Sequence, residues 1–375
     1  MAIPITAPSI EDDDVAAVSA VLRTGMLVQG KNVLAFEARL AELIGVREVV
    51  AVSNCTAALQ MALLGLGVGV GDLVVVTAYS WLSTANVIEL CGAQPVFVDI
   101  RPDTFNMDVE ALAETLRRVM SNRDCARRVK AILPVHTFGQ MAEIDRIISL
   151  GAEYGLPVIE DAACALGARL GDRVAGSQGV LGCFSFHPRK AVTTGEGGVI
   201  TTNDARLADH MRALRNHGQR PGAQPPVFDL AGFNYRMTDF QAALGVTQLA
   251  KLDRINAARR AAAARYDRLL AGTGITPPFV APGAFHVYQS YVTLLPAALA
   301  ARRVDIMASM KAQGIETAIG TYSMPSTAYF QARYQVSLPQ ALDIASRSLS
   351  LPLFEALTAA EQAAVIATLC EAAAR

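Results

Sequence analysis

The stretch CFSFHPRKAVTTGEGGVITT, residues 183–202, decides the fold because two strand patterns flank a polar loop that contains glycines. CFSFH (183–187) and VITT (199–202) are rich in aromatic and β-branched residues, which favour strands. The loop between them holds Lys190, one of only five lysines in a chain with 28 arginines. The other four are expected to be solvated charges: Lys31, Lys130, Lys251 and Lys311. Lys190 is therefore the lysine to examine for chemistry.

Five further short apolar runs precede this stretch: VVAVS (49–53), LVVVTA (73–78), PVFVDI (95–100), VKAILPVH (129–136) and LPVIEDA (156–162). They are continuously apolar rather than alternating, which is typical of strands that are covered on both faces. Segments with helical spacing fill most of the gaps between them. This alternation predicts an α/β fold with a mostly parallel seven-stranded sheet, in which ligands bind beyond the carboxyl ends of the strands.

The pattern changes near Met237, where one long helical pattern begins and runs to a segment rich in glycine and proline. After it come a strand-like run, QSYVTLLP (289–296), and two further helical patterns. We therefore expect a large domain over residues 1–245, whose N-terminal segment packs on the small domain. A connecting helix and a smaller α/β domain are expected over residues 246–375.

Composition and charge argue against several classes of partner. The 33 basic and 34 acidic residues are interspersed, so there is no basic surface signal for nucleic acid. The acidic N-terminus lacks the order of a signal peptide, and the most apolar run is broken by polar residues, so no membrane partner is expected. The six scattered cysteines form no metal-binding pattern and predict buried thiols in a reducing cytoplasm.

Polar and aromatic side chains gather where the predicted strands end. Cys55 and Thr56 open a helix after the first run, and a helix N-terminus binds anions such as phosphate. Trp81, the only tryptophan, follows the second run, and Glu160 with Asp161 ends the fifth. Taken singly, these residues are also explained as helix caps or as a core aromatic.

As a set, these groups meet the requirements of pyridoxal 5′-phosphate (PLP). Its aldehyde needs a lysine amine to form a Schiff base. Its pyridine nitrogen needs a carboxylate, because the protonated ring withdraws electrons from the substrate carbon. Its phosphate needs N–H and hydroxyl donors, and its ring needs flat apolar contacts. The sequence therefore indicates PLP as the cofactor.

Four segments resemble one known family: PVHTFGQMAEID, VIEDAACALGA, CFSFHPRKAVTTGEGGVITT and GFNYRMTDFQAALGVTQLAKLD. They are similar to the DegT/StrS-type sugar aminotransferases, which are PLP-dependent enzymes of fold type I. The similarity extends from LRTGMLVQGKNVLAFE near the start to SLPLFEALTAAEQ near the end. It implies a homodimer that moves an amino group from L-glutamate onto a nucleotide-linked ketosugar, in particular an NDP-4-keto-6-deoxyhexose.

The resemblance also implies roles for individual residues. Lys190 would form the Schiff base and Asp161 would pair with the ring nitrogen. The phosphate and the ring would be held by Cys55, Thr56, Trp81, Ser185 and, from the second subunit, Asn234. Cys164 departs from the family, which usually has Gln or His three residues after the aspartate, near the 3-hydroxyl of PLP. The hydrogen bond to that 3-hydroxyl therefore stays open. Candidate substrate contacts are His136, His187, Arg236 and His286, and His136 and His286 are equally well explained as core or rim histidines.

Three alternatives stay open at this point. The same chemistry could act on a keto-cyclitol, which only a panel of substrates distinguishes. A sugar dehydratase shares the fold, but in that branch the lysine position resembles histidine, so Lys190 argues against it. A PLP-binding regulator without turnover is the third alternative, and the intact set of Lys190, Asp161 and Ser185 argues against it.

Overall fold

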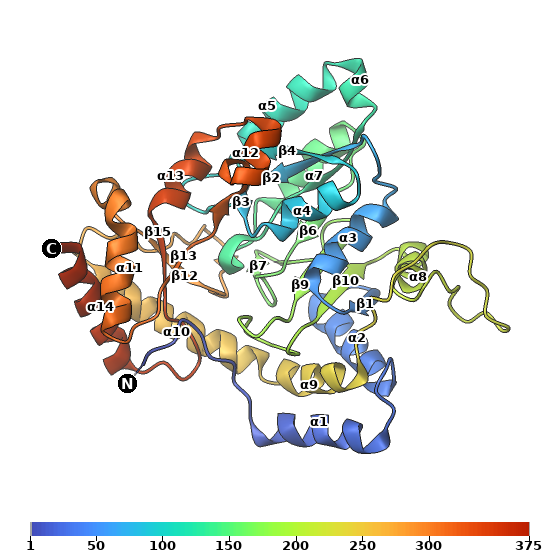
Figure 1. Cartoon of the computed structure of the whole chain (residues 1–375), viewed down its shortest axis with the longest axis horizontal. Coiled ribbons are helices and arrows are strands. Elements are labelled where there is room, and N and C mark those ends of the chain that lie inside the picture. The colour runs from blue at the N-terminus through green and yellow to red at the C-terminus, as the bar shows by residue number, and fades with distance from the viewer. Residues whose placement is uncertain (1, 375) are drawn as a thin grey trace.

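The computed structural model describes residues 2–374 (Figure 1). The strands are β1 (Glu48–Val52), β2 (Leu73–Thr77), β3 (Tyr79–Ser80), β4 (Gln94–Val98), β5 (Val129–Leu133), β6 (Ile159–Asp161), β7 (Arg169–Leu170), β8 (Arg173–Val174), β9 (Leu181–Ser185), β10 (Gly198–Thr202), β11 (Ala284–Phe285), β12 (Tyr291–Leu294), β13 (Ala318–Ile319), β14 (Tyr322–Ser323) and β15 (Ser348–Leu351).

The helices are α1 (Asp12–Thr24), α2 (Lys31–Ile44), α3 (Cys55–Gly65), α4 (Ser83–Leu90), α5 (Val109–Met120), α6 (Arg123–Ala126), α7 (Ile144–Glu153), α8 (Ala205–Leu214), α9 (Asp239–Leu249), α10 (Leu252–Leu270), α11 (Arg303–Ala312), α12 (Ala328–Tyr334), α13 (Pro339–Arg347) and α14 (Ala359–Ala374). Short 3-10 turns are η1 (Thr137–Gly139), η2 (Ala297–Arg302) and η3 (Met324–Ser326). Within residues 2–374, no helix combines the length and the apolar character needed to cross a bilayer.

The seven predicted strands are all present and form the central sheet. Their order is β1-β10-β9-β6 in one hydrogen-bonded group and β4-β2-β5 in the other. Parallel bridges from Ile132 to Val158 and from Val135 to Asp161 place β5 beside β6 and join the two groups. Only β10 runs against its neighbours, β1 and β9. The prediction of a mostly parallel sheet of seven strands is therefore confirmed.

The antiparallel direction of β10 follows from the connection that precedes it. Parallel neighbours need a long crossover, usually a helix, whereas antiparallel neighbours can be joined by a loop. The segment 186–197 between β9 and β10 contains no helix. It therefore returns the chain at the edge where β9 ends, and Lys190 is held in this return loop.

Both faces of the sheet are covered, as the continuously apolar strands predict. In β1, Val50 and Val52 belong to one buried cluster while Val49 and Ala51 belong to another. Helices α3, α4 and α8 contribute to the first cluster, and α2, α5 and α7 contribute to the second. Neighbouring strand residues point to opposite faces, so each strand is buried from both sides.

A third buried cluster belongs to the C-terminal part of the chain. It combines side chains of α10, α11 and α14 with those of β12 and β15. Ile3 packs in the same cluster and bridges to Ile315, so the N-terminal segment does lie on the C-terminal elements. Residues of η3, α12 and α13 instead join the first cluster against the central sheet. The domain boundary near residue 245 stays a prediction.

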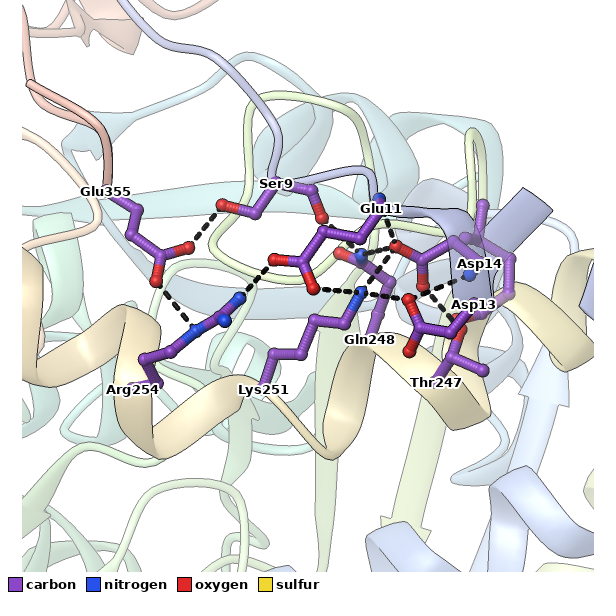
Figure 2. A network of polar contacts seen from close by, with 10 residues as sticks. Ser9, Glu11, Asp13, Asp14, Thr247, Gln248, Lys251, Arg254 and Glu355 are labelled. Atoms are coloured by element: carbon purple, nitrogen blue, oxygen red, sulfur yellow. Dashed lines mark hydrogen bonds and ion pairs between the residues drawn. The ribbon is translucent and has the colours of Figure 1, made fainter. Parts of the chain in front are cut away.

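The long helical pattern after Met237 is not one helix, and this expectation is wrong. The chain breaks between α9 and α10 at Ala250 and Lys251. Lys251 is also not a solvated charge: it is 8% exposed and contacts Glu11, Asp13 and Asp14 at 3.3, 2.8 and 2.7 Å. Figure 2 shows its ammonium group facing these three carboxylates from the start of α1. Neither glycine nor proline marks the break, and these tertiary ion pairs hold it.

Candidate active site

The parallel strands bring most of the predicted site residues to one edge of the sheet. β1 and β9 both run against β10, so they run in the same direction as β6, β5 and β2. Their carboxyl ends therefore share one edge. The turn with Cys55 and Thr56, the end of β6 at Asp161 and the end of β9 at Ser185 all lie there.

Asp161 is a buried carboxylate whose side chain is held by neutral donors. Its Oδ2 accepts a hydrogen bond from the Thr84 hydroxyl at 2.8 Å, and its Oδ1 accepts one from the Ala163 N–H at 3.2 Å. Burial raises the pKa of Asp161, although the bond from Thr84 opposes this shift. No ion pair reaches Asp161 in the described part of the chain. A buried carboxylate of this kind is stabilised by a cationic partner.

Glu160, the neighbouring acid, has an entirely structural environment. Its carboxylate accepts hydrogen bonds from three backbone N–H groups, of Gly176, Gln178 and Gly179. His136 Nε2 contacts the same carboxylate at 2.7 Å. Burial raises the pKa of Glu160, but these hydrogen bonds bring it below its ordinary value. Adjacent strand residues point to opposite faces, so only Asp161 faces the site.

This arrangement also decides the role of His136. Its Nδ1 accepts a hydrogen bond from the Ala142 N–H at 3.1 Å, and its side chain is fully buried. Both ring nitrogens are therefore occupied by the protein. His136 is a core histidine, and its alternative interpretation as a substrate contact is not supported.

Lys190 lies in the return loop with its amine against a thiol. Its Nζ donates a hydrogen bond to Cys164 Sγ at 3.1 Å. Burial lowers the pKa of Lys190, but Cys164, Cys55 and Asp161 outweigh it and raise the pKa above its ordinary value. Cys164, whose hydrogen bonding the sequence left open, is thus a direct neighbour of the candidate catalytic amine.

The helix that begins at Cys55 presents free N–H groups at the same edge. Asn54 caps the helix by accepting from the Ala57 N–H at 2.9 Å, which leaves the N–H groups of Cys55 and Thr56 without an intrahelical acceptor. A side chain at Gly198 would lie 2.6 Å from the Cys55 nitrogen, so only glycine lets β10 approach this turn. The turn therefore fits an anionic group such as phosphate.

Two other predicted cofactor contacts, Trp81 and Ser185, lie at or directly after the end of a strand. Trp81 follows β3, is 61% exposed and packs edge-on against Tyr322 with ring centroids 5.7 Å apart. Its exposed ring offers the flat apolar surface that PLP requires. Ser185, at the end of β9, is half-buried, and within residues 2–374 its Oγ accepts only a long 3.5 Å hydrogen bond from the His187 N–H. Its hydroxyl is therefore free to donate.

The four remaining predicted residues lie in different surroundings. His187 is partly exposed and 3.9 Å from Glu196, and burial lowers its pKa. His286 is 3% exposed, stacks on Tyr288 and has its pKa lowered by burial to about 3, so it gives a sugar no open face. Arg236 bridges to Val52 through its backbone and donates to Asn216. Asn234 is exposed, and its contact across a subunit interface stays a prediction.

Sequence reasoning missed the hydroxyl chain behind Asp161. Ser80 Oγ lies 3.0 Å from Thr84 Oγ1, which in turn donates to Asp161. Ser80 is the last residue of β3 and Thr84 lies in the first turn of α4, so the two stand on either side of Trp81 in the chain. Ligands bind beyond the carboxyl ends of the strands, so this part of the chain was a place to look. Serine and threonine are also common at helix starts, however, so the sequence does not distinguish a hydroxyl that bonds to Asp161 from one that caps the helix.

A buried carboxylate, a lysine in a return loop and a helix N-terminus at one edge of this sheet define a PLP-dependent enzyme of the α/β class. A model of the DegT/DnrJ/EryC1/StrS aminotransferase family matches residues 8–370. GDP-perosamine synthase from Caulobacter vibrioides is 38% identical over 345 residues, which are 91% of this chain and 90% of that protein.

Two solved structures are similar over the whole chain. Helicobacter pylori PseC, an aminotransferase involved in the biosynthesis of pseudoaminic acid, aligns with a TM-score of 0.92 and 27% identity, covering 99% of both chains. The PLP form of Spr1654 from Streptococcus pneumoniae aligns with a TM-score of 0.92 and 26% identity, covering 100% of this chain and 99% of that one. The chain belongs to the DegT/DnrJ/EryC1/StrS aminotransferase family, whose members are PLP-dependent aminotransferases with this fold.

Proposed function

We propose that the protein transfers the amino group of L-glutamate to the keto carbon of a nucleotide-linked ketosugar, in particular an NDP-4-keto-6-deoxyhexose. The observation that carries the proposal is the meeting of Asp161 and Lys190 at one edge of the sheet beside a helix N-terminus. The names of the relatives support the substrate class, because one is a synthase of the nucleotide sugar GDP-perosamine.

The site residues fit PLP, which supplies an electron sink for the bond broken at the amino-bearing carbon. Asp161 would hold the positive charge on the ring nitrogen, because a buried carboxylate favours a cationic partner. The N–H groups of Cys55 and Thr56, together with the Ser185 hydroxyl, would hold the phosphate. Trp81 would cover one face of the ring.

Lys190 would bind the cofactor aldehyde and then act as the base that moves the proton from the carbon of the amino donor. A protonated amine cannot accept this proton, so the raised pKa of Lys190 has to fall when its surroundings change. A neighbouring cation would favour such a fall in the pKa of the amine. The groups that face Lys190 are instead thiols and a carboxylate, so the positive charge would have to come from the bound ligand.

We also propose that two copies share their active sites. Between α8 and α9 the chain extends away from the body of the molecule as an arm (Figure 1). A bridge between Gln219 and Phe228 shapes this arm as a hairpin, and Phe228 is 61% exposed at the surface. A bridge between Asn216 and Asn234 brings together the two ends of this arm. An exposed apolar arm that carries a predicted cofactor contact fits a second copy of the chain.

All six cysteines are free thiols, which supports a reducing, cytoplasmic setting for this activity.

The proposed activity is tested by incubating the PLP-loaded protein with L-glutamate and a panel of NDP-4-keto-6-deoxyhexoses and keto-cyclitols. Formation of 2-oxoglutarate and an aminosugar is measured by mass spectrometry. Amination of the cyclitols alone would contradict the proposed substrate.

A further inference from the structure

The peptide units on both sides of Lys190 are held by one side chain from the C-terminal part of the protein. Gln289 Oε1 accepts a hydrogen bond from the Ala191 N–H at 3.1 Å. Its Nε2 donates to the Arg189 carbonyl at 2.5 Å. A single carboxamide therefore clamps the backbone before and after Lys190, although Gln289 is 99 residues away in sequence.

Gln289 is itself held in an unusual turn. Tyr288 has a φ of +48°, a left-handed conformation that residues other than glycine rarely adopt. His286 stabilises it: its Nδ1 accepts from the Tyr288 N–H at 2.9 Å and its ring stacks on the Tyr288 ring at 4.0 Å. The turn therefore fixes the direction in which the Gln289 side chain leaves the backbone.

Behind this turn lies a buried arginine. Arg259, on α10, is 2% exposed, and its Nη1 donates to the carbonyls of Tyr288 and Gln289 at 3.3 and 3.2 Å. No carboxylate forms an ion pair with it in the part of the chain that the structure describes, and its Nε has no hydrogen-bond partner there. A buried cation paired only with carbonyls is costly. It is placed where it can hold the two carbonyls of the turn.

We propose that Gln289 is a positioning residue for Lys190, and that Arg259 positions Gln289 in turn. A lysine has four rotatable side-chain bonds, so the direction of its amine depends on how firmly its backbone is fixed. Through this relay, the orientation of the candidate catalytic amine depends on the third buried cluster, whose helices lie far from Lys190 in sequence. The inference rests on the proposed role of Lys190.

The test compares Gln289→Ala and the conservative variant Gln289→Glu with the wild-type protein, each freed of cofactor and then supplied with PLP. Borohydride, added at successive times after PLP, fixes PLP on the lysine that binds it, and peptide mass spectrometry gives both the modified lysine and the rate of loading. We expect Gln289→Ala to slow loading at Lys190 and to lower kcat by up to about 10²-fold, the loss that about 1 Å of misplacement can cause. The KM for L-glutamate should stay within about threefold, because positioning of the amine acts after the donor has bound.

Gln289→Glu provides a pH readout that a merely structural role would not produce. An ionised glutamate still accepts from the Ala191 N–H but cannot donate to the Arg189 carbonyl. When it is protonated it can do both. The deficit relative to the wild-type protein at the same pH should therefore shrink as the pH falls.

Gln140 is a matched control because its carboxamide makes the same kind of clamp elsewhere. Its Nε2 donates to the Phe279 carbonyl at 3.0 Å, and its Oε1 accepts from the Ala281 N–H at 2.8 Å. Gln140→Ala should lower the Tm at least as much as Gln289→Ala, since Gln140 is only 2% exposed, and should leave loading at Lys190 unchanged.

Two outcomes would overturn the inference while leaving the proposed function intact. One is wild-type-like loading of Lys190 in Gln289→Ala, and the other is an equal loss of loading in Gln140→Ala. If borohydride fixes PLP on a different lysine of the wild-type protein, the proposed role of Lys190 fails and the inference fails with it.

Discussion

At the scale of single residues, two neighbouring acids at the end of β6 take opposite roles because their hydrogen-bond partners differ. The Glu160 carboxylate is hydrogen-bonded by His136 and three backbone N–H groups, so its acceptors are occupied by the protein. Asp161 keeps a raised pKa because burial is only partly offset by Thr84. The protein thus leaves one carboxylate available for a cationic ligand and satisfies the other.

Lys190→Ala should abolish transamination while the fold is kept, because no other described lysine lies at this edge of the sheet. The expected loss in kcat is at least about 10²–10⁴-fold, the range for a group that transfers a proton. Enzyme assays together with the Tm check this. Lys311→Ala is the control and should behave like the wild-type protein. Wild-type turnover in Lys190→Ala would contradict the whole assignment of the site.

Asp161→Asn should reduce turnover roughly 10²-fold or more, because a neutral amide cannot stabilise charge on the ring nitrogen. Asparagine keeps an oxygen that can accept from the Ala163 N–H, so the fold should be retained. If Asp161 served only as a cap, kinetics would stay nearly normal, and Asp161→Ala would cost roughly 0.5–2 kcal/mol of stability. Single-turnover rates and thermal unfolding on the same preparation distinguish the two outcomes.

At the scale of secondary-structure elements, the start of α1 is fastened to the α9–α10 junction by the ion-pair cluster around Lys251 (Figure 2). Asp14 is 1% exposed and receives hydrogen bonds from Thr247 and Gln248 as well as from Lys251. Arg254 extends the cluster by pairing with Glu11 and Glu355. The cluster therefore links the start of α1 to the α9–α10 junction and, through Glu355, to the segment that precedes α14.

Lys251→Met should destabilise the protein by about 3–5 kcal/mol, because it leaves the buried Asp14 carboxylate without its cation. Thermal unfolding measures the effect. Lys31→Met is the matched control, since Lys31 is exposed at the start of α2, and it should change the Tm little. Equal Tm values for the two variants would contradict a buried ion pair at Lys251.

The same cluster predicts how stability responds to acid. Burial raises the pKa of Asp14, but the hydrogen bond from Lys251 lowers it below the ordinary value of 3.8. A carboxyl whose pKa is lower in the folded state stabilises the protein above 3.8, and this contribution is lost as the pH falls through the folded-state value. The unfolding free energy should therefore fall more steeply below pH 3.8 in the wild-type protein than in Lys251→Met.

At the scale of the whole molecule, the arm between α8 and α9 exposes apolar side chains that nothing in the described part of a single copy of the chain covers. It leaves the body of the protein and exposes Val227 and Phe228, while the ion pair between Arg220 and Asp229 stiffens it. We expect it to lie against a second copy, with Asn234 near the phosphate of that copy. A two-fold axis would then produce two composite sites.

Complementation between two inactive variants tests this arrangement. Lys190→Ala and Asn234→Asp should each be inactive as homodimers, the latter because its added charge repels the phosphate. A heterodimer carries both lesions in one site and leaves the other site intact, so co-refolded mixtures should regain activity. Mixtures that form heterodimers but stay as inactive as their parents would place Asn234 outside the shared site.

The sequence alone determined the seven strands of the sheet, because apolar runs of four to eight residues without alternation are typical of strands that are covered on both faces. It also placed Lys190, Asp161 and Cys55 at strand ends, since parallel strands bring their carboxyl ends to one edge. These inferences depend on local patterns and on general rules for α/β sheets, so they need no knowledge of distant contacts.

Tertiary structure alone decided which polar groups meet. It distinguished the role of Asp161 from that of Glu160 and placed the Cys164 thiol next to the Lys190 amine. It also interrupted the long helix at Lys251 and brought the Gln289 side chain to the backbone beside Lys190. Each of these contacts joins residues whose local sequence fits an ordinary cap, core or surface position. The partner of a side chain depends on how whole helices and strands pack together. Sequence periodicity indicates only which residues share one face of a helix or strand.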